Sequence, residues 1–79
     1  MRAVIMEAVP SALVDVRQML CAQALAVVAQ AMGRIEMGEI VQVLYDTEDV
    51  RRDLLAWASD RGHRVDDRRA AMLHIERGR

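Results

Sequence analysis

The chain has no lysine and no phenylalanine, and its 79 residues include a single cysteine, one proline, one tryptophan and one tyrosine. One cysteine cannot form a disulfide within the chain, so we expect a fold held by its core alone, in the reducing cytoplasm. The shortage of aromatic side chains removes the stacking platforms that bind single-stranded nucleic acid. The composition therefore argues against direct nucleic-acid binding.

Charges of the two signs almost cancel, with eleven arginines and twelve acidic residues for a net charge of −1. The arginine-rich half, residues 46–79, contains eight arginines and eight acidic residues. This balance again argues against a polyanionic partner. The chain is 53% hydrophobic and 29% charged, as in compact globular domains. We expect one domain, residues 1–79, near the lower size limit for independent folding.

Long apolar runs are also missing. The longest uncharged stretch, residues 18–33, contains glutamines and falls short of the ~18 apolar residues of a membrane span. At the N-terminus, a short apolar run is interrupted by Glu7, whereas a secretory signal needs a longer one. The sequence therefore predicts neither a membrane segment nor secretion.

The middle of the chain predicts a strand followed by a helix. The segment EIVQVLY, residues 39–45, is rich in β-branched residues, which is typical of a strand. The next segment, DTEDVRRDLLAWASDRGH, residues 46–63, has apolar residues at helical spacing. Asp46 or Thr47 can cap its N-terminus, and Gly62 suits the left-handed conformation that ends many helices.

The C-terminal part predicts two further strands. In AAMLHIER, residues 70–77, apolar and polar residues alternate, so Leu73 and Ile75 face one side of a half-exposed strand. Residues 63–65 are predicted to form a short strand before it.

The first part of the chain fits two templates. In one, Ser11 caps a continuous helix that runs to Gly33, Cys21 is an interior residue, and the protein is a small all-helical dimer. In the other, residues 13–17 form a strand, residues 18–20 form a turn, and a helix begins at or near Cys21. Hydrophobic periodicity does not separate these alternatives.

The segment LVDVRQMLCAQA, residues 13–24, contains Asp15, Arg17 and Cys21 in an order that resembles a family pattern of the type LDxRGxxCPxP. That pattern is carried by the TusA/SirA/YeeD-like family of small sulfur-carrier proteins. GEIVQVLYD resembles the second strand of this family with its acidic end at Asp46. DLLAWASDRGH resembles the helix that ends in a Gly-His pair, here closing at His63. The resemblance covers about residues 13–77.

The resemblance implies an α+β fold, a two-layer α/β sandwich in which two helices pack on one face of a four-stranded mixed sheet in the order β-α-β-α-β-β. It also favours the second template for residues 11–33. The chain departs from the family pattern at three positions. Gln18 stands where the family has glycine, and Ala22 and Ala24 stand where it has prolines, which pre-organise a helix start.

The resemblance further implies that Cys21 is the catalytic residue of a sulfur carrier, relaying sulfane sulfur as a persulfide between sulfur-donor and sulfur-acceptor proteins. It assigns supporting positions to Asp15, Arg17, Asp46 and His63. The thiolate is the nucleophile, and a helix N-terminus lowers the pKa of a thiol. His63 is expected either to assist proton transfer or to complete the end of its helix. One cysteine and two distant histidines have no zinc-ligand spacing, so we expect no metal and no cofactor.

The alternative function is a non-catalytic, TusA-like interaction or regulatory module in which Cys21 is a structural residue, since most free cysteines are buried. The protein is then an enzyme, of the sulfurtransferase type, only if Cys21 is active. Independently of any family, residues 21–32 contain only two polar side chains, Gln23 and Gln30. A helix so apolar predicts association through residues 21–32, as a homodimer or a heteromer.

Overall fold

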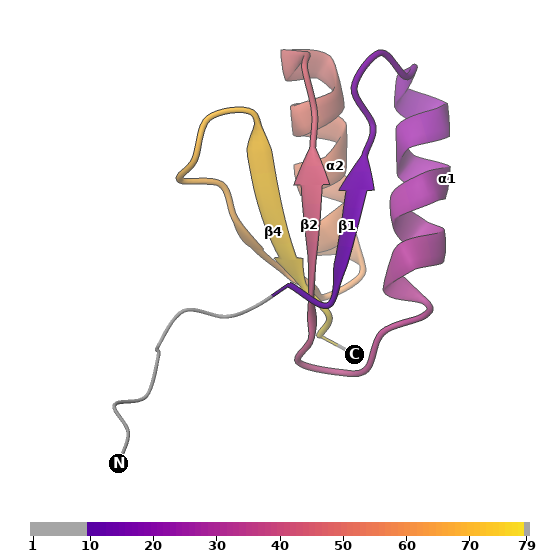
Figure 1. The fold of residues 1–79 in the computed structure, drawn as a ribbon, viewed down its shortest axis with the longest axis vertical. Coiled ribbons are helices and arrows are strands. Elements are labelled where there is room, and N and C mark those ends of the chain that lie inside the picture. Colours follow the sequence, from indigo (N-terminus) through magenta and orange to yellow (C-terminus); the bar gives the residue numbers. More distant parts are fainter. Residues whose placement is uncertain (1–9, 79) are drawn as a thin grey trace.

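Six elements follow one another in the order β-α-β-α-β-β in the computed structural model, which describes residues 10–78 (Figure 1). The N-terminal run interrupted by Glu7 lies outside the described residues. The elements are β1 (Ala12–Asp15), α1 (Cys21–Met32), β2 (Ile40–Leu44), α2 (Glu48–Asp60), β3 (Arg64–Asp66) and β4 (Met72–Glu76).

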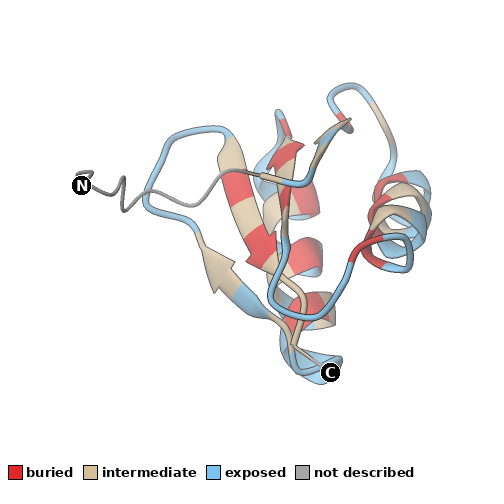
Figure 2. Ribbon diagram, turned by 60° about the horizontal axis from the view of Figure 1, so that its bottom comes forward, coloured by how far each residue is buried: buried red, intermediate tan, exposed pale blue. Residues whose placement is uncertain are grey.

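The four strands form one mixed sheet in the order β1-β2-β4-β3. Strand β1 is parallel to β2, whereas β2–β4 and β4–β3 are antiparallel. A parallel neighbour requires a crossover connection, and α1 provides it between β1 and β2. Both helices lie on the same face of the sheet, as Figures 1 and 2 show. The predicted two-layer α+β sandwich is confirmed.

The continuous helix over residues 11–33 is wrong, and the strand–turn–helix alternative is confirmed. Ala12 to Asp15 pair with Val41 to Leu44 of β2, so the chain is extended there. The backbone then turns at Gln18, whose φ of 69° is incompatible with a right-handed helix. Helix α1 begins at Cys21, although alanines replace the family's two prolines. Tertiary pairing with β2 therefore decides between two patterns that periodicity leaves equal.

Helix α2 has both of its predicted ends. Thr47, rather than Asp46, caps it: the Thr47 side chain accepts a 3.2 Å hydrogen bond from the backbone N–H of Val50. At the other end, Gly62 has a φ of 78°, and the backbone N–H of His63 donates to the carbonyl of Ala58. The chain thus leaves the helix through a left-handed glycine, as the sequence predicts.

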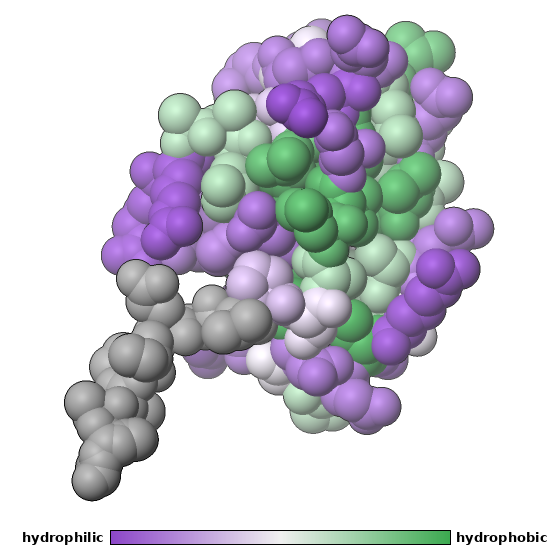
Figure 3. All heavy atoms as spheres, in the orientation of Figure 1, coloured by the Kyte–Doolittle hydropathy of each residue, from purple (hydrophilic) through white to green (hydrophobic). Residues whose placement is uncertain are grey.

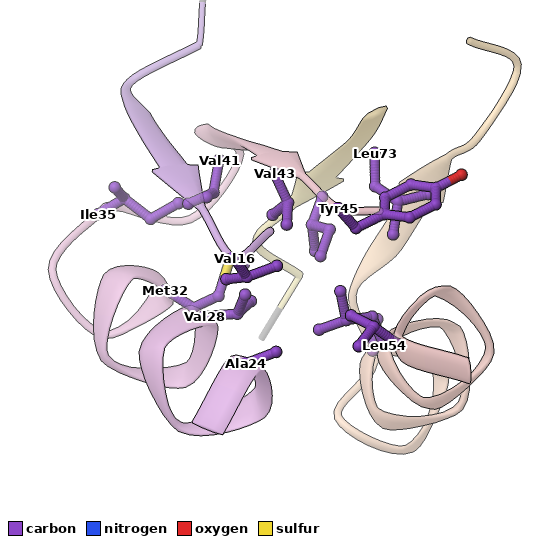
Figure 4. Close-up of a cluster of buried hydrophobic side chains, with 13 residues drawn as sticks. Val16, Ala24, Val28, Met32, Ile35, Val41, Val43, Tyr45, Leu54 and Leu73 are labelled. Carbon is purple, nitrogen blue, oxygen red and sulfur yellow. The ribbon is translucent and has the colours of Figure 1, made fainter. Parts of the chain in front are cut away.

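The core lies between the helices and the sheet (Figure 4). Each helix contributes one stripe at helical spacing, and β2 and β4 contribute alternate residues. Its main members are Ala24, Val28 and Met32 of α1, Val50, Leu54 and Ala58 of α2, and Val41, Val43, Leu73 and Ile75 of the strands. This inward packing of Leu73 and Ile75 was predicted from the alternation in residues 70–77.

The second face of the sheet carries no helix among residues 10–78. Ile40 and Leu44 of β2 and Met72 of β4 are half-buried there, and Leu13 of β1 is 63% exposed. Figure 3 shows hydrophobic residues gathered over the middle of this face.

The outer side of α1 is less apolar than its sequence suggests. Val28 and Met32 point into the core, and the exposed positions are filled by alanines and by Gln23 and Gln30. The helix therefore exposes mainly small side chains, and association along residues 21–32 stays a prediction. Neither α1 nor α2 is long and apolar enough to cross a membrane.

Candidate functional site

Cys21 is the first residue of α1, at the end of the molecule where both helices begin (Figure 1). Its side chain is half-buried and packs against the edge of the core. Cys21 is thus neither a fully buried residue in the middle of the helix nor a fully exposed one. The sequence prediction that Cys21 lies at the amino end of its helix is confirmed.

The turn before Cys21 is shaped by Asp15 and Arg17. The Arg17 guanidinium donates two hydrogen bonds to the Asp15 carboxylate, of 2.9 and 2.7 Å, and its backbone N–H donates a third of 3.0 Å. These bonds hold the pKa of Asp15 at about 2, mainly through the Arg17 side chain. Because its charge is matched by Asp15, Arg17 organises the turn rather than supplying a free cation for the thiol.

Asp46 ties this turn to the end of β2. Its carboxylate accepts a 2.9 Å hydrogen bond from the backbone N–H of Gln18, the residue in the left-handed conformation. The family pattern has glycine here, and the φ of Gln18 gives the physical reason, since glycine adopts positive φ without a steric cost. The local backbone of the pattern is therefore retained without its glycine.

The pKa of Cys21 is raised, which contradicts the sequence-based expectation of a helix-activated thiolate. The largest cause is hydrogen bonding to the Asp53 carboxylate, followed by burial of the sulfur and by the negative charges of Asp53 and Asp49. Arg52 acts in the opposite direction. Carboxylates on α2 and burial thus raise the pKa of Cys21 despite its place at the start of a helix, so the protonated thiol is favoured at rest.

His63 follows the C-terminal end of α2, whereas Cys21 lies at the end of the molecule where α2 begins. Its ring packs on Trp57, with the centroids 5.4 Å apart, and its Nδ1 accepts a 3.1 Å hydrogen bond from the backbone N–H of Gly78. Burial, then the charges of Arg77 and Arg61, lower the pKa of His63. The structure therefore gathers Asp15, Arg17 and Asp46 around the turn before Cys21 but leaves His63 at the end of its helix.

The residues that act on the thiol from α2 were not among the site residues predicted from the sequence, where capping and surface charge explained the acids of this helix. Asp49, Arg52 and Asp53 share one helical face by their i, i+3, i+4 spacing, and Arg52 forms a 2.6 Å ion pair with Asp49. The spacing alone could have grouped them. That this face lies beside Cys21 follows only from the packing of α2 against α1.

No group of three or more metal-ligating side chains occurs in the part of the chain that the structure describes. The chemistry available at this end of the molecule is that of one thiol beside carboxylates and an arginine. A thiol that gives up its proton can take part in sulfur exchange without a metal.

A model of the family described as Sulfurtransferase TusA matches residues 12–72. The protein belongs to the TusA sulfurtransferase family. The TusA match runs from the start of β1 to the first residue of β4, and so includes Cys21 and the turn before it. Membership supports a sulfur-carrier role, in which sulfur passes between partner proteins. Comparisons with curated proteins and with solved structures gave no significant match.

Proposed function

We propose that this protein relays sulfane sulfur in the cytoplasm as a persulfide on Cys21, between a sulfur-donor and a sulfur-acceptor protein. The observation that carries the proposal is the position of the chain's single thiol. Cys21 begins α1 in a TusA-family domain, where its sulfur is partly exposed.

The transfer is a thiol exchange in which atoms and electrons balance. Cys21 loses its proton, and its thiolate attacks the terminal sulfur of a donor persulfide, R–S–SH. A new S–S bond forms on Cys21, the donor S–S bond breaks, and the donor leaves as R–S⁻, which takes up the proton. Repeating the step with an acceptor thiolate passes the sulfur on and regenerates Cys21. No external oxidant or reductant is consumed.

Asp53 influences the state of the resting thiol. Hydrogen bonding to its carboxylate is the largest cause of the raised pKa of Cys21, which favours the protonated sulfur. The protonated form protects a carrier from unwanted oxidation between transfers, because the thiolate is the form that reacts with oxidants.

The raised pKa of Cys21 also favours a second candidate function. A thiol that stays protonated is a weaker nucleophile, as in a non-catalytic TusA-like interaction or regulatory module with a structural cysteine. The two functions differ in whether Cys21 accepts sulfur under native conditions.

Intact-mass measurement after exposure to inorganic polysulfide separates them. A carrier gains about 32 daltons per sulfur atom on Cys21, the mass change of persulfidation, and Cys21→Ser gains nothing. Peptide mapping places the added sulfur. If the folded wild-type protein shows no adduct at any pH up to the ordinary pKa of a free cysteine thiol, the carrier function is excluded. The interaction module then remains as the function.

A further inference from the structure

Leu20 is the most exposed large hydrophobic residue that the structure describes, with 75% of its surface open to solvent. It directly precedes Cys21 and occupies the N-cap position of α1, with backbone angles of φ −72° and ψ 158°. The residue that precedes Cys21 in the chain therefore presents an aliphatic side chain to water.

Leucine is a poor choice for this position by local criteria. An N-cap normally carries a side-chain oxygen that accepts a hydrogen bond from the first turn of the helix. Leu20 supplies none, and the Gln23 side chain only partly compensates by accepting a 3.2 Å bond from the Leu20 N–H. Solvent exposure gives the leucine no compensating burial. Residues that break a local sequence preference and gain no stability from packing are often functional.

The position of Leu20 also has a geometric consequence. For sulfur to pass, a sulfur atom of the partner must come into contact with the sulfur of Cys21. The partner surface around that atom then covers the neighbouring residue as well.

The surroundings of Leu20 define the rest of the contact. Met19, half-buried, supports the turn from the core side. On the α2 side lie the exposed side chains of Asp49, Arg52 and Asp53, with Arg52 paired to Asp49, and Asp46 holds the turn itself. A hydrophobic centre with a charged and polar rim is the usual anatomy of a protein–protein interface.

We propose that Leu20 is the docking residue for the sulfur-donor protein: it enters an apolar pocket beside the donor's persulfide and brings that sulfur to Cys21. The inference rests on the proposed carrier function. It assigns to Leu20 a binding role, whereas sulfur exchange itself belongs to Cys21. Burial of one well-placed aliphatic anchor accounts for a large share of the affinity of many interfaces.

The test uses Leu20→Ser, because serine is a preferred N-cap residue and the variant should unfold at the same or a higher temperature than the wild type. Sulfur loading is measured from two sources. One is inorganic polysulfide, which needs no docking. The other is each cysteine desulfurase of the source organism, with L-cysteine as substrate. Loading from the desulfurase should require about tenfold more Leu20→Ser for the same rate, the loss typical of removing an interface anchor, while loading from polysulfide is unchanged.

Two control variants accompany it. Leu20→Met keeps an aliphatic side chain of similar size and should load from the desulfurase nearly as well as the wild type. Met37→Ser removes another large apolar side chain, 70% exposed, from the loop at the far end of α1. It should have no effect on loading from either source, because it lies away from Cys21.

Equal desulfurase loading of Leu20→Ser and wild type would overturn the inference. So would a wild-type protein that takes sulfur from polysulfide and from no desulfurase, although the carrier function would then stand. If polysulfide leaves no sulfur on wild-type Cys21, the carrier function fails and the inference fails with it. A selective loss from the desulfurase, restored in Leu20→Met, supports a docking role that stability alone cannot produce.

Discussion

Cys21 begins α1 beside Asp53 of α2, and hydrogen bonding to this carboxylate is the largest cause of the raised pKa of the thiol. The positive end of a helix favours a thiolate, whereas a carboxylate beside it disfavours one. In this protein the pKa of Cys21 is raised, so the thiol must lose a proton before it reacts.

Asp53→Asn should therefore make Cys21 more reactive towards small electrophiles at neutral pH. Removing the negative charge lowers the pKa of the thiol, so the rate of alkylation by iodoacetamide should rise at lower pH than in the wild type. The measurement is the alkylation rate against pH, followed by intact mass. Asp49→Asn should shift the profile less, because Asp49 acts on the thiol only through its charge. Coincident profiles for wild type and Asp53→Asn would contradict this account.

Gln18→Gly should stabilise the fold by about 1 kcal/mol, the approximate cost of a left-handed conformation for a residue with a Cβ. Gln18 has a φ of 69°, and its N–H, which glycine retains, donates to Asp46. Urea denaturation followed by circular dichroism gives the change in the free energy of unfolding. Ala71, with a φ of 59°, offers an independent comparison in Ala71→Gly. A loss of stability in Gln18→Gly would mean that the glutamine side chain contributes something that compensates for its backbone.

Thr47→Ala should lower the free energy of unfolding by about 1 kcal/mol, because the first turn of α2 loses its side-chain acceptor. The bond at risk is the 3.2 Å contact from the Val50 N–H. Thr47→Ser keeps the hydroxyl and serves as the control. Thermal and urea unfolding should rank Thr47→Ser close to wild type. If Thr47→Ala and Thr47→Ser unfold alike, the hydroxyl is not the source of the stability.

Lowering the pH should destabilise the protein through His63. Its pKa is lower in the folded state than its ordinary value, so below about pH 6.5 the unfolded chain binds a proton that the folded chain does not. The contribution is fully present above that pH and is lost as the pH falls towards the folded pKa. In His63→Gln, the slope of stability against pH between 7.5 and 5.5 should be smaller. An NMR titration of the His63 ring that shows an ordinary or raised pKa would contradict the prediction.

Much of the secondary structure follows from local patterns, each contained within one short segment of the sequence. The helix ending at Gly62 and the alternation of Leu73 and Ile75 were predicted from residues 46–63 and 70–77, because caps, turns and amphipathic periods are local signals. The predicted cap was ambiguous between Asp46 and Thr47. The structure assigns the capping bond to Thr47 and leaves Asp46 free to accept from the Gln18 backbone.

For residues 11–33, local sequence signals were not sufficient to predict the secondary structure. Both templates for this segment satisfied its periodicity, and the resemblance to the TusA pattern, rather than any propensity, separated them. In the structure the deciding interaction is the pairing of β1 with β2, residues about thirty positions apart. Such pairing is a property of the assembled sheet, and no window of sequence contains it.

By itself, the sequence determined that one thiol would be available and that Asp15 and Arg17 would precede it, because composition and spacing are written in the chain. The α+β domain followed from the resemblance to the family pattern rather than from composition or spacing. Tertiary structure alone decided the state of that thiol. Asp53 is thirty-two residues further along the chain, and only the packing of α2 against α1 brings its charge to Cys21. Electrostatic interactions depend on distance in space, so the pKa of the sulfur followed from the fold and could not be read from its neighbours in sequence.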